Sequence, residues 1–220
     1  MKIATWNVER LKHKSALGEM RRICEELNAD ILVLTETDLR LHPDSRCAYH
    51  TLLLFEHKPL YYKPTENRVS IFTNYPCVSS YTTYDDYTSL CVELKTEIGD
   101  FLVYGTIIGI YGNRHPNFKQ DLEKQVNDLK RLSSFGKPLC IIGDYNLSFS
   151  DNWYFTNYGR ETLLRSFQEN HLRLLTADVK ECIDHIAVSE NFVGSRKITI
   201  REWNLDKSLS DHKGVIVSFQ

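Results

Sequence analysis

The sequence contains no hydrophobic run long enough to cross a membrane, and no long apolar segment of the secretory-leader type follows Met1. Internal repeats and low-complexity tracts are also missing. Apolar residues make up 42% of the 220 residues and charged residues 25%, which is ordinary for a globular protein. We therefore expect one α/β domain over residues 1–220, located in the cytoplasm and without a membrane segment.

Paired cysteine motifs are missing as well. The six cysteines are scattered without a Cys-x-x-Cys pair, and several fall within apolar segments. This spacing matches neither a zinc site nor a disulfide framework. We interpret the cysteines as reduced core thiols.

The chain also lacks an excess of positive charge, since its formal net charge is −2. Dedicated nucleic-acid binders usually carry a strongly basic surface. A polyanionic substrate would therefore have to be held by local cations and a metal ion. Six cations near polar motifs could contact phosphates, although scattered surface cations would give the same pattern: Arg10, Lys12, Lys14, Arg68, Arg114 and Lys119.

What the sequence does contain is a series of short apolar segments. They predict strands at 1–8, 29–34, 69–73, 139–142, 183–188, 198–203 and 215–219. Alternating residues on both sides of the Gly99-Asp100 turn predict an antiparallel hairpin from 90–95 and 101–110. Apolar residues at helical spacing predict helices at 17–27, 118–132 and 162–170, and 41–67 is expected to be loop with a short strand. Antiparallel hairpins together with helices favour stacked sheets covered by helices.

Polar clusters end or follow five of the predicted strands. They are Trp6-Asn7-Val8-Glu9, Thr35-Glu36-Thr37, Gly143-Asp144-Tyr145-Asn146, Cys182-Ile183-Asp184-His185 and Ser210-Asp211-His212. Each cluster alone is compatible with a turn or a solvated surface pair. Strands of one sheet pair could bring all five to a common rim, so the ordered set predicts a site.

The side chains of this rim suit phosphoester chemistry. Glu36 is a hard oxygen ligand of the kind that Mg²⁺ accepts, and Asp144 can take a proton from an attacking water. Asn7 and Asn146 do not titrate, but their amides can orient a carboxylate or donate to a phosphate oxygen.

The imidazole of His212 can hydrogen-bond a phosphate, and either Asp184 or Asp211 could fix its tautomer.

Taken in order, these motifs resemble the endonuclease/exonuclease/phosphatase superfamily, which includes exonuclease III, apurinic/apyrimidinic endonucleases, deoxyribonucleases, 5-phosphatases and sphingomyelinases. The resemblance covers nearly the whole chain. It implies an α/β four-layer sandwich of two mixed, mostly antiparallel β-sheets flanked by helices, with a Mg²⁺ or Mn²⁺ site at one end. It also implies in-line hydrolysis of a phosphoester.

The resemblance implies roles for the residues of the five motifs. Glu36 would bind the metal, with Glu9 and Asp211 as further or water-mediated ligands, and Asp144 would activate water or bind a second metal. The remaining catalytic candidates would position Asp144 and polarise the phosphate: Asn7, Asn146, Asp184 and His212. The resemblance further implies that Asp184 holds the His212 ring while Asp211 faces the metal, which predicts the Asp184 carboxylate within hydrogen-bond distance of His212 in the folded chain.

One catalytic group of several family branches is absent. The deoxyribonuclease, 5-phosphatase and sphingomyelinase branches usually carry a His after the central strand, but 105–110 contains none. The exonuclease III branch has a Tyr there, and Tyr111 lies close to that position but shifted. We therefore treat Tyr111, Arg114 and Trp153 as candidate substrate-binding residues; Trp153 belongs to an aromatic loop that could either stack on a base or cover the sheet.

The sequence thus predicts a divalent-metal-dependent phosphodiesterase, and the missing His favours a nuclease acting on DNA or RNA. A phosphatase or phosphodiesterase of small phosphorylated metabolites or lipid head groups is the alternative. A binding module that keeps the fold without catalysis is a third hypothesis. No protein partner is predicted.

Overall fold

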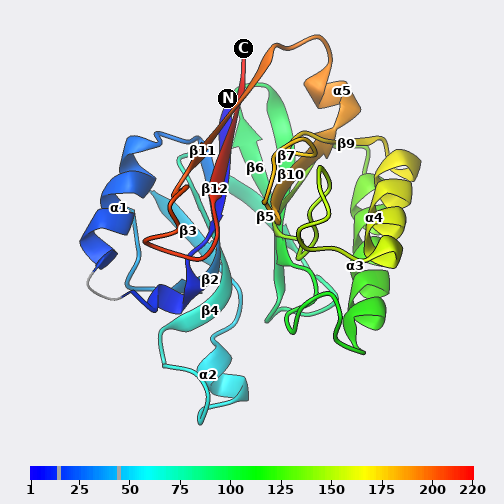
Figure 1. Cartoon of the computed structure of the whole chain (residues 1–220). Coiled ribbons are helices and arrows are strands. Elements are labelled where there is room, and N and C mark those ends of the chain that lie inside the picture. The colour runs from blue at the N-terminus through cyan, green and yellow to red at the C-terminus, as the bar shows by residue number, and fades with distance from the viewer. Residues whose placement is uncertain (14–15, 44–45) are drawn as a thin grey trace.

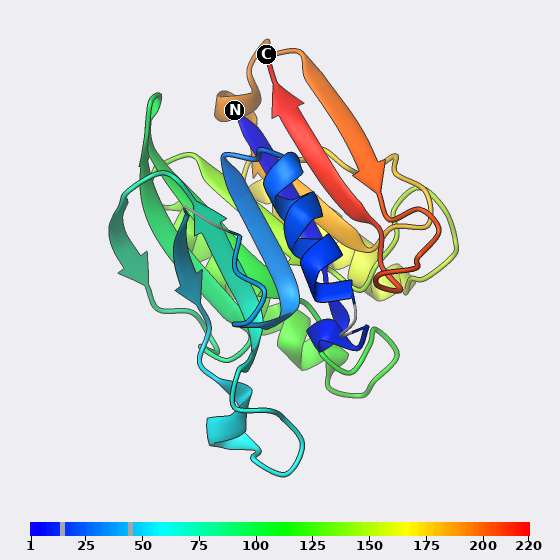
Figure 2. The ribbon, with the colours of Figure 1, turned by 90° about the vertical axis from the view of Figure 1, so that its left-hand side faces the viewer.

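The computed structural model describes residues 1–13, 16–43 and 46–220, so Lys14 lies outside the described residues. Two six-stranded sheets lie face to face, and helices cover their outer faces (Figures 1 and 2). This confirms the predicted α/β sandwich of two mixed sheets flanked by helices.

Sheet A has the order β11 (Ile198–Trp203), β12 (Gly214–Phe219), β1 (Lys2–Asn7), β2 (Ile31–Asp38), β4 (Glu66–Thr73), β3 (Cys47–His50). Sheet B has the order β5 (Cys77–Tyr81), β6 (Ser89–Thr96), β7 (Gly99–Ile107), β8 (Leu139–Asp144), β10 (Asp184–Ser189), β9 (Leu172–Leu174). The helical segments are η1 (Glu9–Leu11), α1 (Leu17–Glu26), α2 (Leu54–His57), α3 (Phe118–Ser133), α4 (Asn157–Glu169) and α5 (Glu190–Val193).

The apolar faces of the two sheets form the central core, in which Val33 and Val69 of sheet A pack against residues of sheet B. Gly105 of β7 lies at a close approach of the two sheets, because a Cβ at this position would be 2.7 Å from Val69 Cγ1. A larger residue would push the sheets apart in a close-packed interior.

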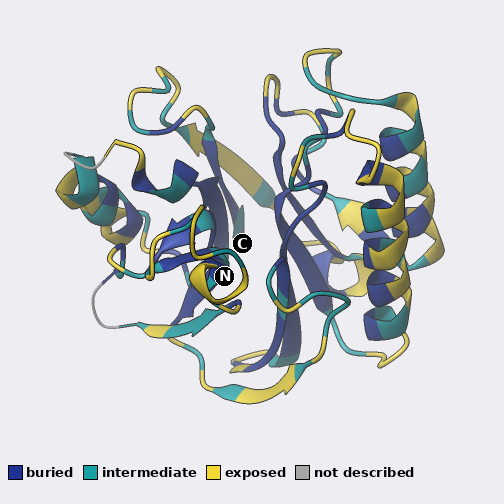
Figure 3. Ribbon diagram, turned by 90° about the horizontal axis from the view of Figure 1, so that it is seen from below, coloured by how far each residue is buried: buried dark blue, intermediate teal, exposed yellow. Residues whose placement is uncertain are grey.

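Each outer layer follows from the spacing of apolar residues on its helix. Met20 and Cys24 of α1 are buried against the outer face of sheet A, while Leu122 and Leu129 of α3 are buried against sheet B together with residues of α4. Figure 3 shows this division, with dark residues facing the sheets and exposed residues on the solvent side of the helices.

Strand direction explains why the polar clusters meet. β1 is parallel to β2 and β7 is parallel to β8, whereas β12 and β10 run antiparallel to β1 and β8. The ends of β1, β2 and β8 and the starts of β10 and β12 therefore share one edge of the sandwich. This edge lies opposite the two termini, toward the bottom of Figure 1.

The structure differs from the sequence-based expectation in several short elements. β5 is an edge strand with mostly exposed residues and β9 has only three residues, so neither produced an alternating pattern. α2 and α5 have four residues each, too short for helical spacing to be visible. α4 begins at Asn157 instead of 162, because the Thr156 side chain caps it by accepting from the Gly159 amide. β7 ends at Ile107, so the last three residues of the predicted strand belong to a loop.

No helix in the described part of the chain is long and apolar enough to span a bilayer. All six cysteines are unpaired, and four of them are buried.

Candidate active site

Asn7, the last residue of β1, connects carboxylates from the two sheets. Its buried side-chain amide donates to Glu36 Oε1 at 3.3 Å and to Asp144 Oδ2 at 3.1 Å. The Asn7 Oδ1 atom accepts from the backbone amide of Glu9 at 2.9 Å, which fixes the amide orientation. Because its amide group donates to both carboxylates, Asn7 links Glu36 and Asp144 through a single side chain.

Glu36 lies near the end of β2 with a left-handed backbone, φ +46°. Such a conformation costs a non-glycine residue about 1–3 kcal/mol and is often found at functional sites. Its side chain keeps 35% of its exposure, and Oε2 lies 3.5 Å from the Arg10 guanidinium. Glu36 is therefore a rim carboxylate that is held by a hydrogen bond and is still reachable from solvent.

Asp144 ends β8 and is 3% exposed. The residue before it must be glycine, because Gly143 has φ +136° and a Cβ there would lie 2.1 Å from the Thr106 carbonyl oxygen. Asp144 Oδ1 accepts from the Asn146 backbone amide at 2.8 Å. Burial raises the pKa of the Asp144 carboxyl, although the nearby His212 acts in the opposite direction.

His212 and Asp184 form a close pair, with 2.6 Å between Nδ1 and Oδ2. Asp184 begins β10 opposite Asp144 in the strand ladder and is 1% exposed. Burial of the imidazole disfavours its charged form, but Asp184, Asp144 and Asp211 outweigh this and raise the pKa of His212 to about 10. The predicted tether is thus present, while the Asp211 carboxylate lies 3.6 Å from Nε2 and is 67% exposed.

Ser210 orients this loop, a role that the sequence did not reveal. Its hydroxyl donates to the Asn7 carbonyl at 2.6 Å and accepts from the His212 amide at 3.2 Å. The Trp6 indole donates to the His212 carbonyl at 3.1 Å, so β1 holds the loop at two points. In the sequence, only its place in the Ser-Asp-His run pointed to Ser210.

Asn146 has a left-handed backbone, φ +52°, and its side-chain amide donates to the Ile108 and Gly109 carbonyls at 3.0 and 3.3 Å. Its link to Asp144 therefore comes from the backbone, while its side chain holds the loop after β7. Asn113 from that loop donates to the Asn146 carbonyl at 2.7 Å. Asn113 is 3% exposed, and its Oδ1 atom has no partner in the described ranges, so it is a polar group of the rim that no motif indicated.

Glu9 has a protein partner at each carboxylate oxygen. Lys12 Nζ lies 2.6 Å from Oε1, and the Asp211 amide donates to Oε2 at 2.9 Å. Burial works against ionisation, yet these two contacts lower the pKa of Glu9. Glu9 therefore ties η1 to the loop before β12, and direct metal ligation would require it to lose Lys12.

The donor set of the rim suits a water-rich cation. Within residues 1–13, 16–43 and 46–220, no group of three or more His, Cys, Asp or Glu is arranged to hold a metal ion. Mg²⁺ needs only one or two carboxylates and keeps several waters. The accessible carboxylates of Glu36 and Asp211 fit that requirement, whereas a zinc site with nitrogen and sulfur ligands does not fit.

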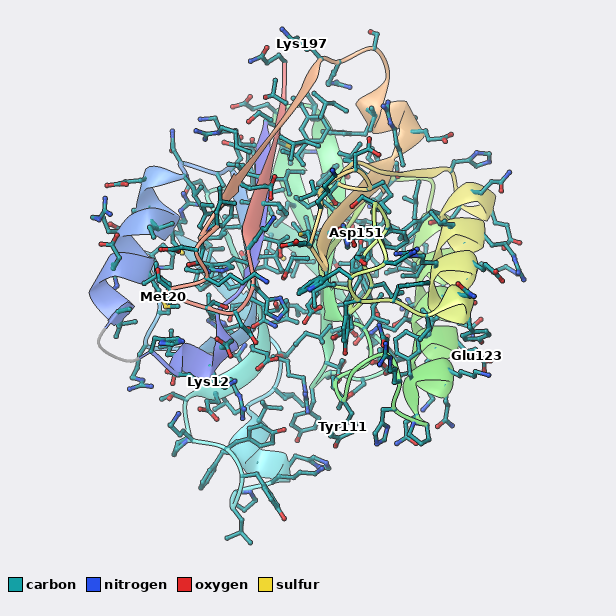
Figure 4. All side chains as sticks on the ribbon, viewed as in Figure 1. Lys12, Met20, Tyr111, Glu123, Asp151 and Lys197 are labelled. Carbon is teal, nitrogen blue, oxygen red and sulfur yellow. The ribbon has the colours of Figure 1, made fainter. Side chains whose placement is uncertain are left out.

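The three candidate substrate-binding residues lie outside the hydrogen-bonded cluster. Tyr111 is 55% exposed, its hydroxyl accepts from Lys58 Nζ at 3.3 Å, and Figure 4 places it at the lower edge of the molecule. Arg114 is exposed in the same loop. Trp153 is 46% exposed, with Lys207 Nζ 4.4 Å from its ring centre.

Two stacked sheets thus bring carboxylates, amides and an imidazole to one rim, a set of groups that suits phosphoester hydrolysis. The model of the Endonuclease/Exonuclease/phosphatase family matches residues 4–212. The chain therefore belongs to this family, as its motifs predicted.

Solved structures agree with this assignment at the level of the fold. The 3'-5' exonuclease NExo from Neisseria meningitidis has 18% identity and a TM-score of 0.74, with 100% of both chains covered. The 3' phosphatase NExo from Neisseria bound to product DNA hairpin has 17% identity and a TM-score of 0.73, with 100% of this chain and 99% of that chain covered. The endonuclease domain of TRAS1, a telomere-specific non-LTR retrotransposon, has 16% identity and a TM-score of 0.73, with 100% and 97% covered. No curated protein sequence matches this chain significantly.

Proposed function

We propose that the chain is a divalent-metal-dependent phosphodiesterase, a nuclease that hydrolyses DNA or RNA. The observation that carries the proposal is the position of Asn7, whose amide binds Glu36 and Asp144 together. A candidate metal ligand and a candidate proton acceptor are thereby held beside each other, an arrangement that suits metal-assisted hydrolysis.

Glu36, with Asp211 on the neighbouring loop, would hold Mg²⁺ or Mn²⁺. When bound, the ion supplies Lewis-acid polarisation of the phosphoryl oxygen. Glu9 supports this site indirectly, because its contact to the Asp211 amide sets the position of that loop.

Asp144 takes the proton of the attacking water. Its raised pKa makes it a stronger base than an exposed Asp, while the Asn7 and Asn146 amides hold its two oxygens. The side chain therefore meets the water in one orientation. Asn146 helps to position the phosphate indirectly, because its side chain fixes the loop after β7.

His212 donates a hydrogen bond to a phosphate oxygen and stabilises the charge that develops there. Asp184 engages Nδ1, which leaves Nε2 for the substrate, and the raised pKa keeps the ring protonated at neutral pH. Asp184 is thus a positioning residue, and His212 the group that meets the phosphate.

A nucleic-acid substrate is supported by cations and aromatic rings around the rim. Arg10 and Arg68 both lie against the Tyr62 ring, at 5.6 and 5.9 Å from its centre. Exposed Tyr111 and Trp153 on the sheet B side could stack on bases. The unpaired cysteines fit a reducing compartment, so the cytoplasm is the proposed location.

The test is a screen of single- and double-stranded DNA and RNA with Mg²⁺, Mn²⁺ or a chelator, with Asp144→Ala as control. We expect chain cleavage that depends on metal and on Asp144. Release of inorganic phosphate from sugar or lipid head-group phosphates, without cleavage of nucleic acid, would replace the nuclease with the small-substrate alternative. Absence of both reactions and of metal binding would leave a binding module.

A further inference from the structure

A cavity of about 340 Å³ lies beside the candidate active site, between the β5–β6 loop, the loop after β7 and the first turns of α3. This volume falls in the usual range for small-molecule sites, about 300–1,000 Å³. Its lining comes from all three segments and includes Tyr84, Gly109, Tyr111 and Phe118. None of them was assigned a role in hydrolysis above except Tyr111, a candidate for substrate binding.

The cavity and the active site share one stretch of backbone. Gly109 lines the cavity, and its carbonyl accepts from the Asn146 side chain at 3.3 Å. The preceding residue, Ile108, donates its amide to the Asp144 carbonyl at 2.8 Å. A substrate bound at Asp144 would therefore reach the cavity with the group adjacent to its phosphate.

The walls of the cavity are aromatic and partly planar. The Tyr111 and His115 rings lie 4.9 Å apart at 39°, and the buried Phe118 ring packs directly under Gly109. A Cβ at Gly109 would lie 2.4 Å from the Phe118 ring, so glycine is what allows this close approach. Rings in this arrangement suit a flat aromatic ligand.

The cavity is lined by two carboxylates and one ammonium group, those of Asp85, Asp121 and Lys124. Asp121 accepts from the Tyr84 hydroxyl at 2.5 Å and from the Gly109 amide at 2.6 Å. Acceptors and a donor side by side match the amino groups and ring nitrogens of a neutral base, whereas carboxylates disfavour a phosphate. The exposed Arg114 belongs to the same loop but does not line the cavity, so it remains available for the backbone phosphate outside.

We propose that this cavity binds a nucleobase of the substrate strand, one next to the scissile phosphate. The inference rests on the proposed nuclease function and adds to it a base-binding subsite. The base enters between Tyr111 and Phe118, and the sugar-phosphate backbone remains on the side of Arg114.

Gln120→Trp tests the proposal, because Gln120 is exposed on α3, lines the cavity and would fill it with an indole. The matched control is Asn127→Trp, an exposed position two turns along the same helix that does not line the cavity. Thermal melting checks that both variants fold. Cleavage is then measured with single-stranded oligonucleotides that carry an abasic residue at each position around the cleaved bond in turn.

We expect Gln120→Trp to raise KM for the intact oligonucleotide roughly five- to twentyfold, the size of one lost stacking contact, with kcat unchanged. Asn127→Trp should behave as the native chain. At one abasic position the native chain should show the same rise, and Gln120→Trp should add nothing further.

Two other results would overturn the inference in different ways. If the folded Gln120→Trp variant cleaves every oligonucleotide as the native chain does, the chain is a nuclease without this subsite. If the native chain cleaves no nucleic acid at all, the proposed function fails, and the subsite fails with it.

Discussion

The two sheets contribute unlike halves to the candidate active site. On the sheet A side, Glu36 keeps 35% of its side-chain exposure and faces Arg10. On the sheet B side, Asp144 and Asp184 are 3% and 1% exposed. In the described chain their side-chain partners are the Asn7 amide and the His212 imidazole, with no Lys or Arg bonded to either.

This difference in burial separates a carboxylate that can exchange its partner from carboxylates that are held in a fixed arrangement. An exposed carboxylate paired with a surface cation can change its partner at little cost, because such pairs contribute only about 0–1 kcal/mol. A buried carboxylate cannot, since losing its partner leaves a charge without compensation. In the proposed reaction, the exposed carboxylate of sheet A would therefore admit the ion, and the buried carboxylate of sheet B would take the proton.

The largest effect should come from the buried half. Asp144→Asn keeps the shape but removes the proton acceptor, so we expect kcat to fall by about a thousandfold, within the range of lost general-base catalysis. Since burial raises the pKa of Asp144, the acid limb of the native kcat/KM profile should lie above the usual Asp range near about 4. The variant should lose this limb. Steady-state rates between pH 4 and pH 9 check both points.

Asp128→Asn is the matched control for a buried acid of the same half. Asp128 is 7% exposed but serves structure, since it accepts from the Tyr84 amide at 2.7 Å and pairs with Arg131 at 2.9 Å. Its loss should lower the melting temperature and leave kcat of the folded protein unchanged. A similar fall in kcat for both variants would show that Asp144 acts only through stability.

The exposed half should respond through metal affinity. Glu36→Gln removes the negative ligand, and we expect Mn²⁺ to bind about a hundredfold more weakly, with a parallel loss of activity at low metal concentration. Electron paramagnetic resonance of Mn²⁺ measures the affinity directly. Glu56→Gln, an exposed acid on α2, should leave it unchanged. Equal affinities of the Glu36 variant and the native chain would remove Glu36 from the metal site.

The His212–Asp184 pair offers a pH test of the buried half. Asp184→Asn should lower the pKa of His212 from about 10, because the carboxylate that favours the imidazolium is removed. kcat should fall about ten- to thirtyfold as the protonated donor is lost. A group whose pKa is higher in the folded chain than in the unfolded chain stabilises the fold fully below its unfolded pKa. This stabilisation is lost as the pH rises through the folded pKa. The native chain should therefore lose stability as pH approaches about 10, and the variant should not. NMR titration in chelator is the measurement, and an unchanged His212 titration would contradict the tether.

Long apolar segments made the layered fold predictable. The strand ends carrying Asn7, Glu36 and Asp144 could be located because buried strands leave a clear signal and parallel neighbours end at one edge. β5 could not, since its exposed residues lack alternation. The start of α4 could not be predicted either, because its first turn has no apolar pattern and is fixed by the cap that the Thr156 hydroxyl provides.

Most contacts between distant segments could not be read from the chain. The pairing of Asp184 with His212 was predicted and is present, but nothing near Asn113 indicates that it meets Asn146. The left-handed conformation of Glu36 is equally invisible, since it depends on the tertiary setting of β2.

The smallest expected effect tests whether the exposed half exchanges a cation for the metal. The Arg10 guanidinium lies 3.5 Å from Glu36 Oε2 and against the Tyr62 ring, so an arriving ion must displace it. Arg10→Gln removes the competitor, and we expect Mn²⁺ to bind about two- to fivefold more tightly, the worth of one exposed ion pair.

Net charge alone would produce part of that gain, because any cation removed near the rim reduces repulsion of the ion. Arg68→Gln removes the same charge from the other guanidinium against the Tyr62 ring, which forms no ion pair within the described residues. If Arg10 competes for the ligand itself, its variant must gain more affinity than the Arg68 variant at the same ionic strength. Salt distinguishes the two causes further, since the long-range part of the gain should shrink as ionic strength rises while direct competition for Oε2 persists. Equal gains that vanish together at high salt would show that the two halves differ in charge but not in their ability to exchange partners.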